Sequence, residues 1–183
     1  MNGFSMERAV RDNWNETVAT DRSGARRLFS DLVREICRFH ILFEEAGIST
    51  GDRIALCGED SLRHTAASFA VSMYKAEAVA IPNDLSAERI TESLRRSDSA
   101  LLLVDGPTWR RLSDDYSSSD LPDVVSADDG SALRARRTVA RAAMRVDALY
   151  AEQYPQGICA GDVSVAAAAN LLAALRTEKR IAG

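Results

Sequence analysis

Apolar and polar positions follow a helical period in one stretch of the chain and form unbroken apolar runs in others. Apolar side chains recur every three or four positions between residues 32 and 46, the spacing of one helix face. We expect this helix to begin after an N-cap at Ser30, with Asp31 in its first turn. We expect it to end at Gly47, because glycine adopts the left-handed C′ conformation without strain.

Three short apolar segments follow, each separated from the next by an amphipathic segment. The sequences RIALC (residues 53–57), AVAIP (78–82) and ALLLV (100–104) are strand candidates. The last has no polar alternation, and such continuous apolar runs suit strands covered on both faces. Asp60 or Ser61 is the expected cap of the first intervening helix, and Ser86 caps the second. This succession predicts an α/β fold with a parallel sheet flanked by helices.

The pattern is less regular beyond residue 105. Residues 107–112 predict one or two helical turns, and residues 113–122 a loop. The sequence DVVS (123–126) predicts a further short strand, and a helix is expected from about residue 131 to residue 150. The segment 165–175, rich in alanine and leucine, predicts a closing helix.

These elements divide the chain into three expected parts. Residues 1–27 form a polar lead segment, in which residues 21–27 predict a turn around Gly24. The other two parts are an α/β sheet subdomain over residues 28–126 and a helical extension over residues 127–183.

Composition narrows the class of protein. The chain has 183 residues, of which 46% are hydrophobic, enough for one domain with a sizeable core. A net charge of −4 and an aromatic content of 6% argue against nucleic-acid binding. Three widely spaced cysteines indicate a reducing compartment, so we expect a cytoplasmic protein. The longest apolar run, residues 163–175, is short for a membrane span and is interrupted by Asn170.

The residues that carry chemistry do not assemble into a recognisable site. No cluster of glycines precedes a helix with a lysine, as a phosphate-binding loop requires, and residues 157–161 predict a turn. Cys37 and His40 share a helix face, but two ligands do not make a zinc site. His64 has no identifiable carboxylate or cysteine partner. We therefore assign no catalytic, cofactor-binding or metal-binding residue in this chain.

A row of arginines is the remaining candidate surface. Arg134, Arg137, Arg141 and Arg145 are expected on one face of the helix over residues 131–150. Such a face is usually a solvated surface, although it could also meet a phosphate, a CoA tail or an anionic membrane.

Residues 28–104 resemble the opening of the AMP-forming acyl-CoA ligase family, also called the adenylate-forming or AMP-binding superfamily. The resemblance is carried by FSDL at residues 29–32, GISTGDRIAL at residues 47–56 and KAEAVAIP at residues 75–82. AERI at residues 87–90 and SDSAL at residues 97–101 continue it in the same order and spacing. Further on, Tyr154-Pro155 and residues 162–164 resemble a connecting segment of some bacterial long-chain fatty-acid CoA ligases.

The resemblance implies a function for a complete family member. Such an enzyme joins a carboxylate to ATP with magnesium, giving acyl-AMP and pyrophosphate, and then transfers the acyl group to CoA. The family's phosphate loop, ribose-binding aspartate and C-terminal catalytic lysine have no counterpart here, and Lys179 is not matched to that lysine. The resemblance thus implies an N-terminal portion that is not catalytically competent alone.

Glu77 stands where the family usually has glycine. If this position required a left-handed backbone, a glutamate would cost about 1 kcal/mol or more, and Glu77→Gly would stabilise the protein.

Three interpretations remain open from the sequence. The chain is a portion of a ligase that self-associates or binds the missing remainder, or a non-catalytic α/β binding or assembly module. The third is an unrelated flavodoxin-type nucleotide-binding domain, which the acidic sequence of residues 58–60 (GED) after the first strand disfavours.

Overall fold

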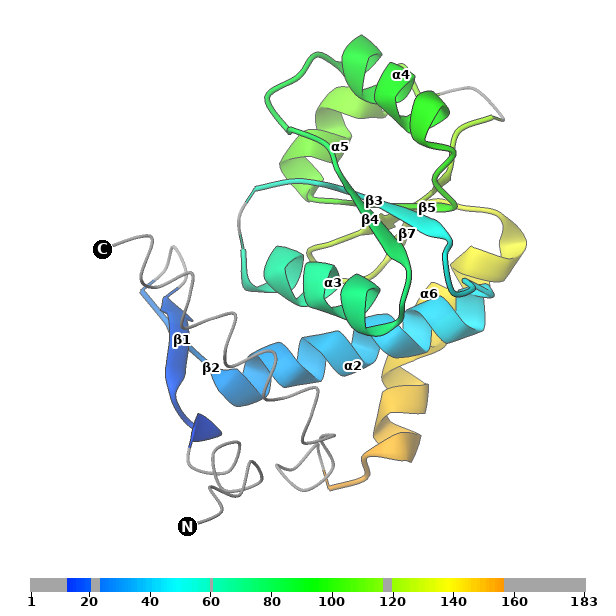
Figure 1. Cartoon of the computed structure of the whole chain (residues 1–183). Helices are drawn as coiled ribbons and strands as arrows, with labels where there is room; N and C mark the ends of the chain where they lie inside the picture. The colour runs from blue at the N-terminus through cyan, green and yellow to red at the C-terminus, as the bar shows by residue number, and fades with distance from the viewer. Residues whose placement is uncertain (1–12, 21–23, 60, 117–119, 157–183) are drawn as a thin grey trace, which may run out of the picture.

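The computed structural model describes residues 13–20, 24–59, 61–116 and 120–156. Its centre is a five-stranded sheet of order β4-β3-β5-β6-β7 (Figure 1). The strands are β3 (Arg53–Cys57), β4 (Glu77–Ala80), β5 (Leu101–Val104), β6 (Asp123–Ser126) and β7 (Ala132–Arg134). The first four run parallel and β7 is antiparallel to β6, which confirms the expected α/β fold.

Helices cover both faces of the sheet. On one face lie α2 (Phe29–Ala46), α3 (Leu62–Met73) and α6 (Arg137–Gln153), and on the other lie α4 (Ala87–Ser97) and α5 (Gly106–Leu112) (Figure 1). Leu101 and Leu103 pack toward the first face, and Leu102 and Val104 toward the second. Burial on both faces explains why β5 is apolar without interruption, whereas β4, at the edge of the sheet, is mostly exposed.

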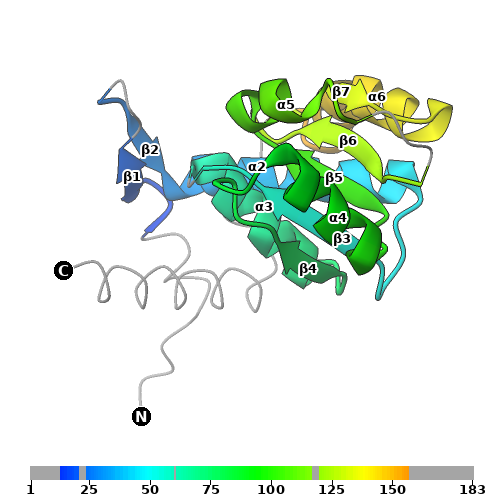
Figure 2. The same ribbon diagram turned by 90° about the horizontal axis from the view of Figure 1, so that it is seen from above.

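A two-stranded antiparallel hairpin, β1 (Thr17–Thr20) and β2 (Arg26–Leu28), lies at the start of α2, outside the main sheet (Figure 2). The sequence predicted only a turn around Gly24 here, and that was incomplete, because Arg26 and Arg27 belong to β2. The rings of Trp14 and Phe29 pack edge to face, with their centroids 6.2 Å apart. This contact attaches the lead segment to the core.

The N-terminus of α2 is capped differently from the expectation. The N-cap is Leu28 rather than Ser30, and the Asp31 carboxylate accepts a hydrogen bond from the Leu28 amide at 3.0 Å. The caps at Ser61 and Ser86 are confirmed, since their side chains accept from the amides of His64 and Arg89. Gly47 ends α2 in the left-handed conformation, as expected.

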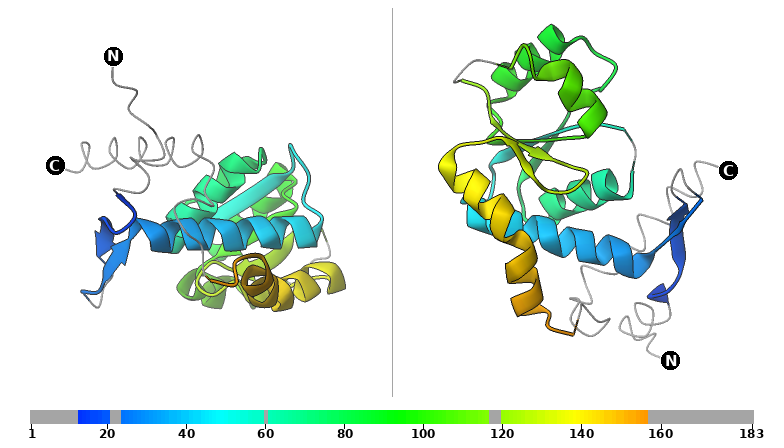
Figure 3. Two further views of the ribbon diagram at one scale, coloured as in Figure 1. Left: turned by 90° about the horizontal axis from the view of Figure 1, so that it is seen from below. Right: turned by 180° about the vertical axis from the view of Figure 1, so that it is seen from behind.

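The predicted start of the last helix, at about residue 131, was wrong. A turn in which Gly130 has a φ of 78° returns the chain along β6, so residues 132–134 form β7 and α6 begins at Arg137. Asp123 fixes this junction by accepting from the Arg136 amide at 2.7 Å and from its Nε at 2.9 Å. The expected division between a sheet subdomain and a helical extension at residue 126 stays a prediction. In the structure, β7 belongs to the same five-stranded sheet and α6 packs against one of its faces (Figure 3).

The closing helix expected over residues 165–175, like Cys159, lies outside the described residues.

Candidate functional site

The carboxyl ends of β3 and β5 lie side by side at the point where the strand order of the sheet reverses. From β3 the chain passes to β4 on one side and returns to β5 on the other. In open α/β sheets, ligands bind in the crevice at such a reversal of strand order, often at a helix N-terminus. The residues that lie there are Gly58 and Glu59 after β3, and Asp105 after β5.

The carboxylate of Asp105 occupies this crevice. Asp105 is buried, with an exposed fraction of 8%, and its Oδ2 accepts from the Glu59 amide at 2.7 Å. Its Oδ1 accepts from the Thr108 amide at 2.8 Å and so caps α5. A Cβ placed on Gly58 would lie 3.0 Å from Asp105 Oδ2, so the two loops are in close contact.

The first three positions of α5 leave no free N–H for an anion. Gly106 donates its N–H to Asp128 Oδ2 at 2.7 Å, Pro107 has none, and Thr108 donates to Asp105. At the start of α3, the Ser61 hydroxyl accepts a hydrogen bond from the His64 amide. The acidic residue Glu59 precedes this helix by three positions. At the described part of this edge, carboxylates therefore accept the α5 amides that an anion would otherwise bind.

Cys57, the last residue of β3, points toward the α4 and α5 side and is fully buried. Burial, together with the charge of Asp105 and against the opposing charge of Arg111, raises the pKa of its thiol to about 11. A thiol with this pKa is protonated at neutral pH and is a poor nucleophile.

The arginines expected on one surface are separated. Arg134 lies in β7, where its guanidinium stands 5.2 Å from the centre of the Tyr116 ring on the other side of the sheet. Arg145 pairs with Glu45 of α2 at 2.6 Å. Arg137 and Arg141 are exposed on α6. The four-arginine face was thus a wrong prediction, because the first member belongs to a strand.

The expected ligand candidates do not converge either. His40 Nε2 lies 3.2 Å from the carbonyl oxygen of Ala70, and burial lowers the pKa of His40 while that hydrogen bond opposes the shift. Cys37 is half-buried on the same helix. Within the part of the chain that the structure describes, no three His, Cys, Asp or Glu side chains are grouped to hold a metal ion.

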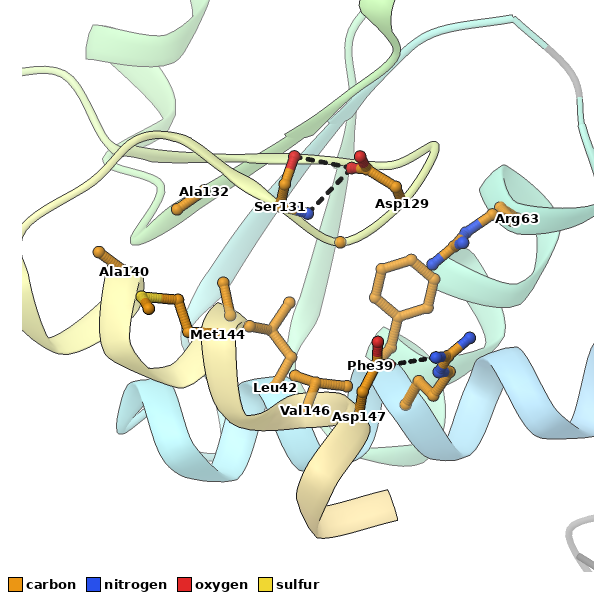
Figure 4. A pocket seen from close by; sticks show the side chains of 13 residues that line it. Phe39, Leu42, Arg63, Asp129, Ser131, Ala132, Ala140, Met144, Val146 and Asp147 are labelled. Atoms are coloured by element: carbon orange, nitrogen blue, oxygen red, sulfur yellow. Dashed lines mark hydrogen bonds and ion pairs between the residues drawn. The ribbon is translucent and has the colours of Figure 1, made fainter. Parts of the chain in front are cut away.

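A second hollow lies between α2, α6 and the turn at residues 129–132 (Figure 4). It has a volume of about 510 Å³, and Phe39 and Leu42 form its floor. Charged side chains lie at one end: Arg63 reaches Glu35 at 3.0 Å, and Arg38 pairs with Asp147. We refer to this hollow as the α2–α6 groove.

Sequence reasoning missed both Asp105 and the α2–α6 groove. An aspartate after a buried strand and before Gly-Pro is a signal for an N-cap, and it could have placed Asp105 at the start of a helix. The groove had no such signal, because it forms between residues about 100 positions apart.

The motifs behind the family resemblance have structural roles here. Gly51 has a φ of 87°, and the Asp52 carboxylate accepts from the Ser49 amide at 2.7 Å, which closes the turn before β3. Arg53 ties β3 to its neighbours by donating to Glu77 and to the carbonyl of Ser97.

A family model described as AMP-binding enzyme matches residues 6–172. The chain belongs to this family. No curated protein matches the chain significantly. The family match also sets aside the interpretation as an unrelated flavodoxin-type domain.

Solved structures show the same fold. Coronafacic acid ligase from Pectobacterium brasiliense is 24% identical with a TM-score of 0.59, over 70% of this chain and 26% of that chain. A benzoate CoA ligase from Burkholderia xenovorans LB400 is 16% identical with a TM-score of 0.59, over 73% and 29% of the two chains. The N-terminal domain of FACL13 from Mycobacterium tuberculosis is 18% identical with a TM-score of 0.56, over 79% and 36%.

The chain thus spans about a quarter to a third of the solved chains that it matches. It corresponds to the N-terminal region of an adenylate-forming ligase. No helix in the described ranges is long and apolar enough to cross a bilayer.

Proposed function

We propose that this chain supplies the N-terminal α/β portion of an adenylate-forming acid ligase and carries no adenylation site of its own. The match to the AMP-binding family over residues 6–172 supports the ligase origin. The Asp105 carboxylate, which takes the amides of Glu59 and Thr108, supports the second part of the proposal. An anionic phosphate would have to displace this buried carboxylate while acidic side chains surround it.

In the complete enzyme, we propose that a carboxylic acid reacts with ATP and magnesium to give acyl-AMP and pyrophosphate, with CoA as the acyl acceptor. The segment at residues 154–164, which resembles that of long-chain fatty-acid CoA ligases, makes fatty acids the first substrates to test. The fold relatives named above act on coronafacic acid and on benzoate, so cyclic and aromatic acids belong in the same panel.

A non-catalytic binding or assembly module is the second proposal, and the closed crevice at Asp105 favours it. Its partners would be the remainder of a ligase or a second copy of the chain, in the cytoplasm. Cys37 and Cys57 are free thiols, which is consistent with a reducing compartment.

ATP–pyrophosphate exchange tests the proposal directly. The chain is assayed with magnesium and a panel of fatty, cyclic and aromatic acids, beside a complete ligase as the positive control. We expect no exchange above that of a protein-free sample. Acid-dependent exchange that elutes with the chain through two purification steps would contradict the proposal.

A further inference from the structure

The α2–α6 groove is open, with an apolar floor and charged side chains at one end, and its most prominent side chain is a methionine. Phe39 and Leu42 of α2 form the floor, and Ala140, Ala143 and Val146 of α6 form one wall (Figure 4). Met144 stands at the rim with 85% of its side chain exposed. A flexible methionine beside an apolar hollow is typical of a surface that receives another apolar element.

We propose that residues 163–175 of the same chain pack into this groove as a helix antiparallel to α6. These residues (VSVAAAANLLAAL) form the longest apolar run of the sequence. Val165, Ala168, Leu172 and Leu175 follow one another by three or four positions, so that they share one helix face. A helix with this small, apolar face fits a shallow hollow lined by alanines.

The connection is long enough for this arrangement. Helix α6 ends at Gln153, and an antiparallel helix that begins at residue 163 would start beside that end and bring Leu172 level with Met144. Residues 154–162 need only reverse the direction of the chain, and they can span about 30 Å when extended. The sequence Tyr154-Pro155 disfavours a continuous helix and allows the chain to reverse. The segment can therefore reach the groove without any change in α6.

Charge complementarity favours the antiparallel direction. In this direction Leu172 lies beside Met144, and the residues after 175 reach the turn that contains Asp128 and Asp129. Both aspartates are exposed, and Arg63, the cation beside Asp129, is paired with Glu35. The apolar run is followed by Arg176, Lys179 and Arg180, with Glu178 among them. A basic end therefore meets an acidic turn, which the parallel direction would not give.

Cross-linking between introduced thiols tests this packing. In a background of Cys37→Ala and Cys159→Ser, Met144→Cys is combined with Leu172→Cys, and the matched control combines Arg141→Cys with Leu172→Cys. Arg141 is exposed on the same helix but does not line the groove. We expect the first pair to form an intrachain disulfide at least about tenfold faster, since packing raises the effective concentration of the two thiols.

Two results of this experiment would overturn the proposal. Equal rates for the two pairs would mean that the tail has no preference for the groove. Cross-links between two chains would mean that a second copy, and not the chain's own tail, fills it.

Thiol labelling gives an independent readout that needs no cross-link. With single thiols in the same background, Met144→Cys should react at least about tenfold more slowly than Arg141→Cys, because the tail shields it. Leu175→Asp should remove this protection, whereas Asn170→Asp, on the opposite face of the tail helix, should retain it. Labelling of Met144→Cys as fast as that of Arg141→Cys would contradict the proposal.

Discussion

At the scale of single residues, the left-handed backbone lies at a different position from the one that the sequence suggested. Glu77 is the first residue of β4, whereas Lys75 has a φ of 61°. Lys75 ends α3 by a Schellman motif, in which its own amide bonds to the Ser72 carbonyl and the Ala76 amide to the Val71 carbonyl. Gly47 ends α2 with the same pattern of bonds and has the residue type that the conformation favours.

Lys75→Gly should therefore stabilise the protein. A left-handed non-glycine residue costs about 1–2 kcal/mol, part of which is lost again through the greater freedom of glycine in the unfolded chain. We expect the free energy of unfolding to rise by about 0.5–1 kcal/mol and the melting midpoint by about 1–4 °C. Urea unfolding at neutral pH measures the change, and an unchanged midpoint would exclude strain at Lys75.

Glu77→Gly should have the opposite effect, and the expectation from the sequence is thereby reversed. Glycine within a strand costs about 0.5–1 kcal/mol, and the exposed ion pair between Glu77 and Arg53 is also lost. The same urea experiment should show a lower midpoint. A higher midpoint would mean that the family's glycine preference at this position has a backbone origin after all.

Cys57 makes the fold sensitive to alkaline pH. Its pKa is raised from 9.0 to about 11 by burial, so the folded chain retains a proton that the unfolded chain loses above pH 9. The stability that it contributes is present below pH 9 and is lost as the pH rises toward 11. Burial also raises the pKa of Tyr116, which acts in the same direction.

The free energy of unfolding at pH 8 and at pH 10.5 measures this effect. We expect it to fall over this range, and the fall should be smaller in Cys57→Ala, which has no thiol to titrate. Since the cavity left by this substitution lowers stability at both pH values, only the difference between them is informative. An equal fall in both proteins would exclude Cys57 as the cause.

At the scale of elements, the sequence predicted the interior strands better than the edge strands and the helix starts. β3 and β5 are apolar on both faces. An interior strand covered on both sides needs such an apolar run, so the run was visible in the sequence. β7 is only three residues long and half-buried, and the turn at Gly130, rather than its own composition, makes it a strand. The groove between α2 and α6 depends on how two distant helices cross, which periodicity does not encode.

The two-faced burial of β5 should make its side chains the most sensitive of the fold. Leu102 is fully buried between β5 and the helices α4 and α5. We expect Leu102→Ala to lower the free energy of unfolding by about 2–5 kcal/mol. Arg95→Ala removes an exposed ion pair with Asp120 and should cost no more than about 1 kcal/mol. Similar losses in the two variants would contradict the described core.

At the scale of the whole molecule, the chain combines a ligase fold with carboxylates that accept backbone amides at the carboxyl edge of its sheet. The parallel sheet places helix N-termini at its carboxyl edge, the usual position of a phosphate site. Asp105 and Asp128 instead take the amides that such a site would use. The family could be anticipated from the sequence, because turn residues such as Gly51 and Asp52 carry the resemblance. The hydrogen bonds of Asp105 and Asp128 could not be anticipated, because the sequence does not show which amide each carboxylate accepts from.

A titration of the ¹⁵N-labelled chain with magnesium and ATP tests this central claim most directly. The amides of Glu59 and Thr108 report on the crevice, and the Gly47 amide, at the end of α2, serves as the reference. We predict no saturable shift of the two crevice resonances up to millimolar ATP. A saturable shift confined to Glu59 and Thr108, with the Gly47 resonance unmoved, would show an open nucleotide site and contradict the account.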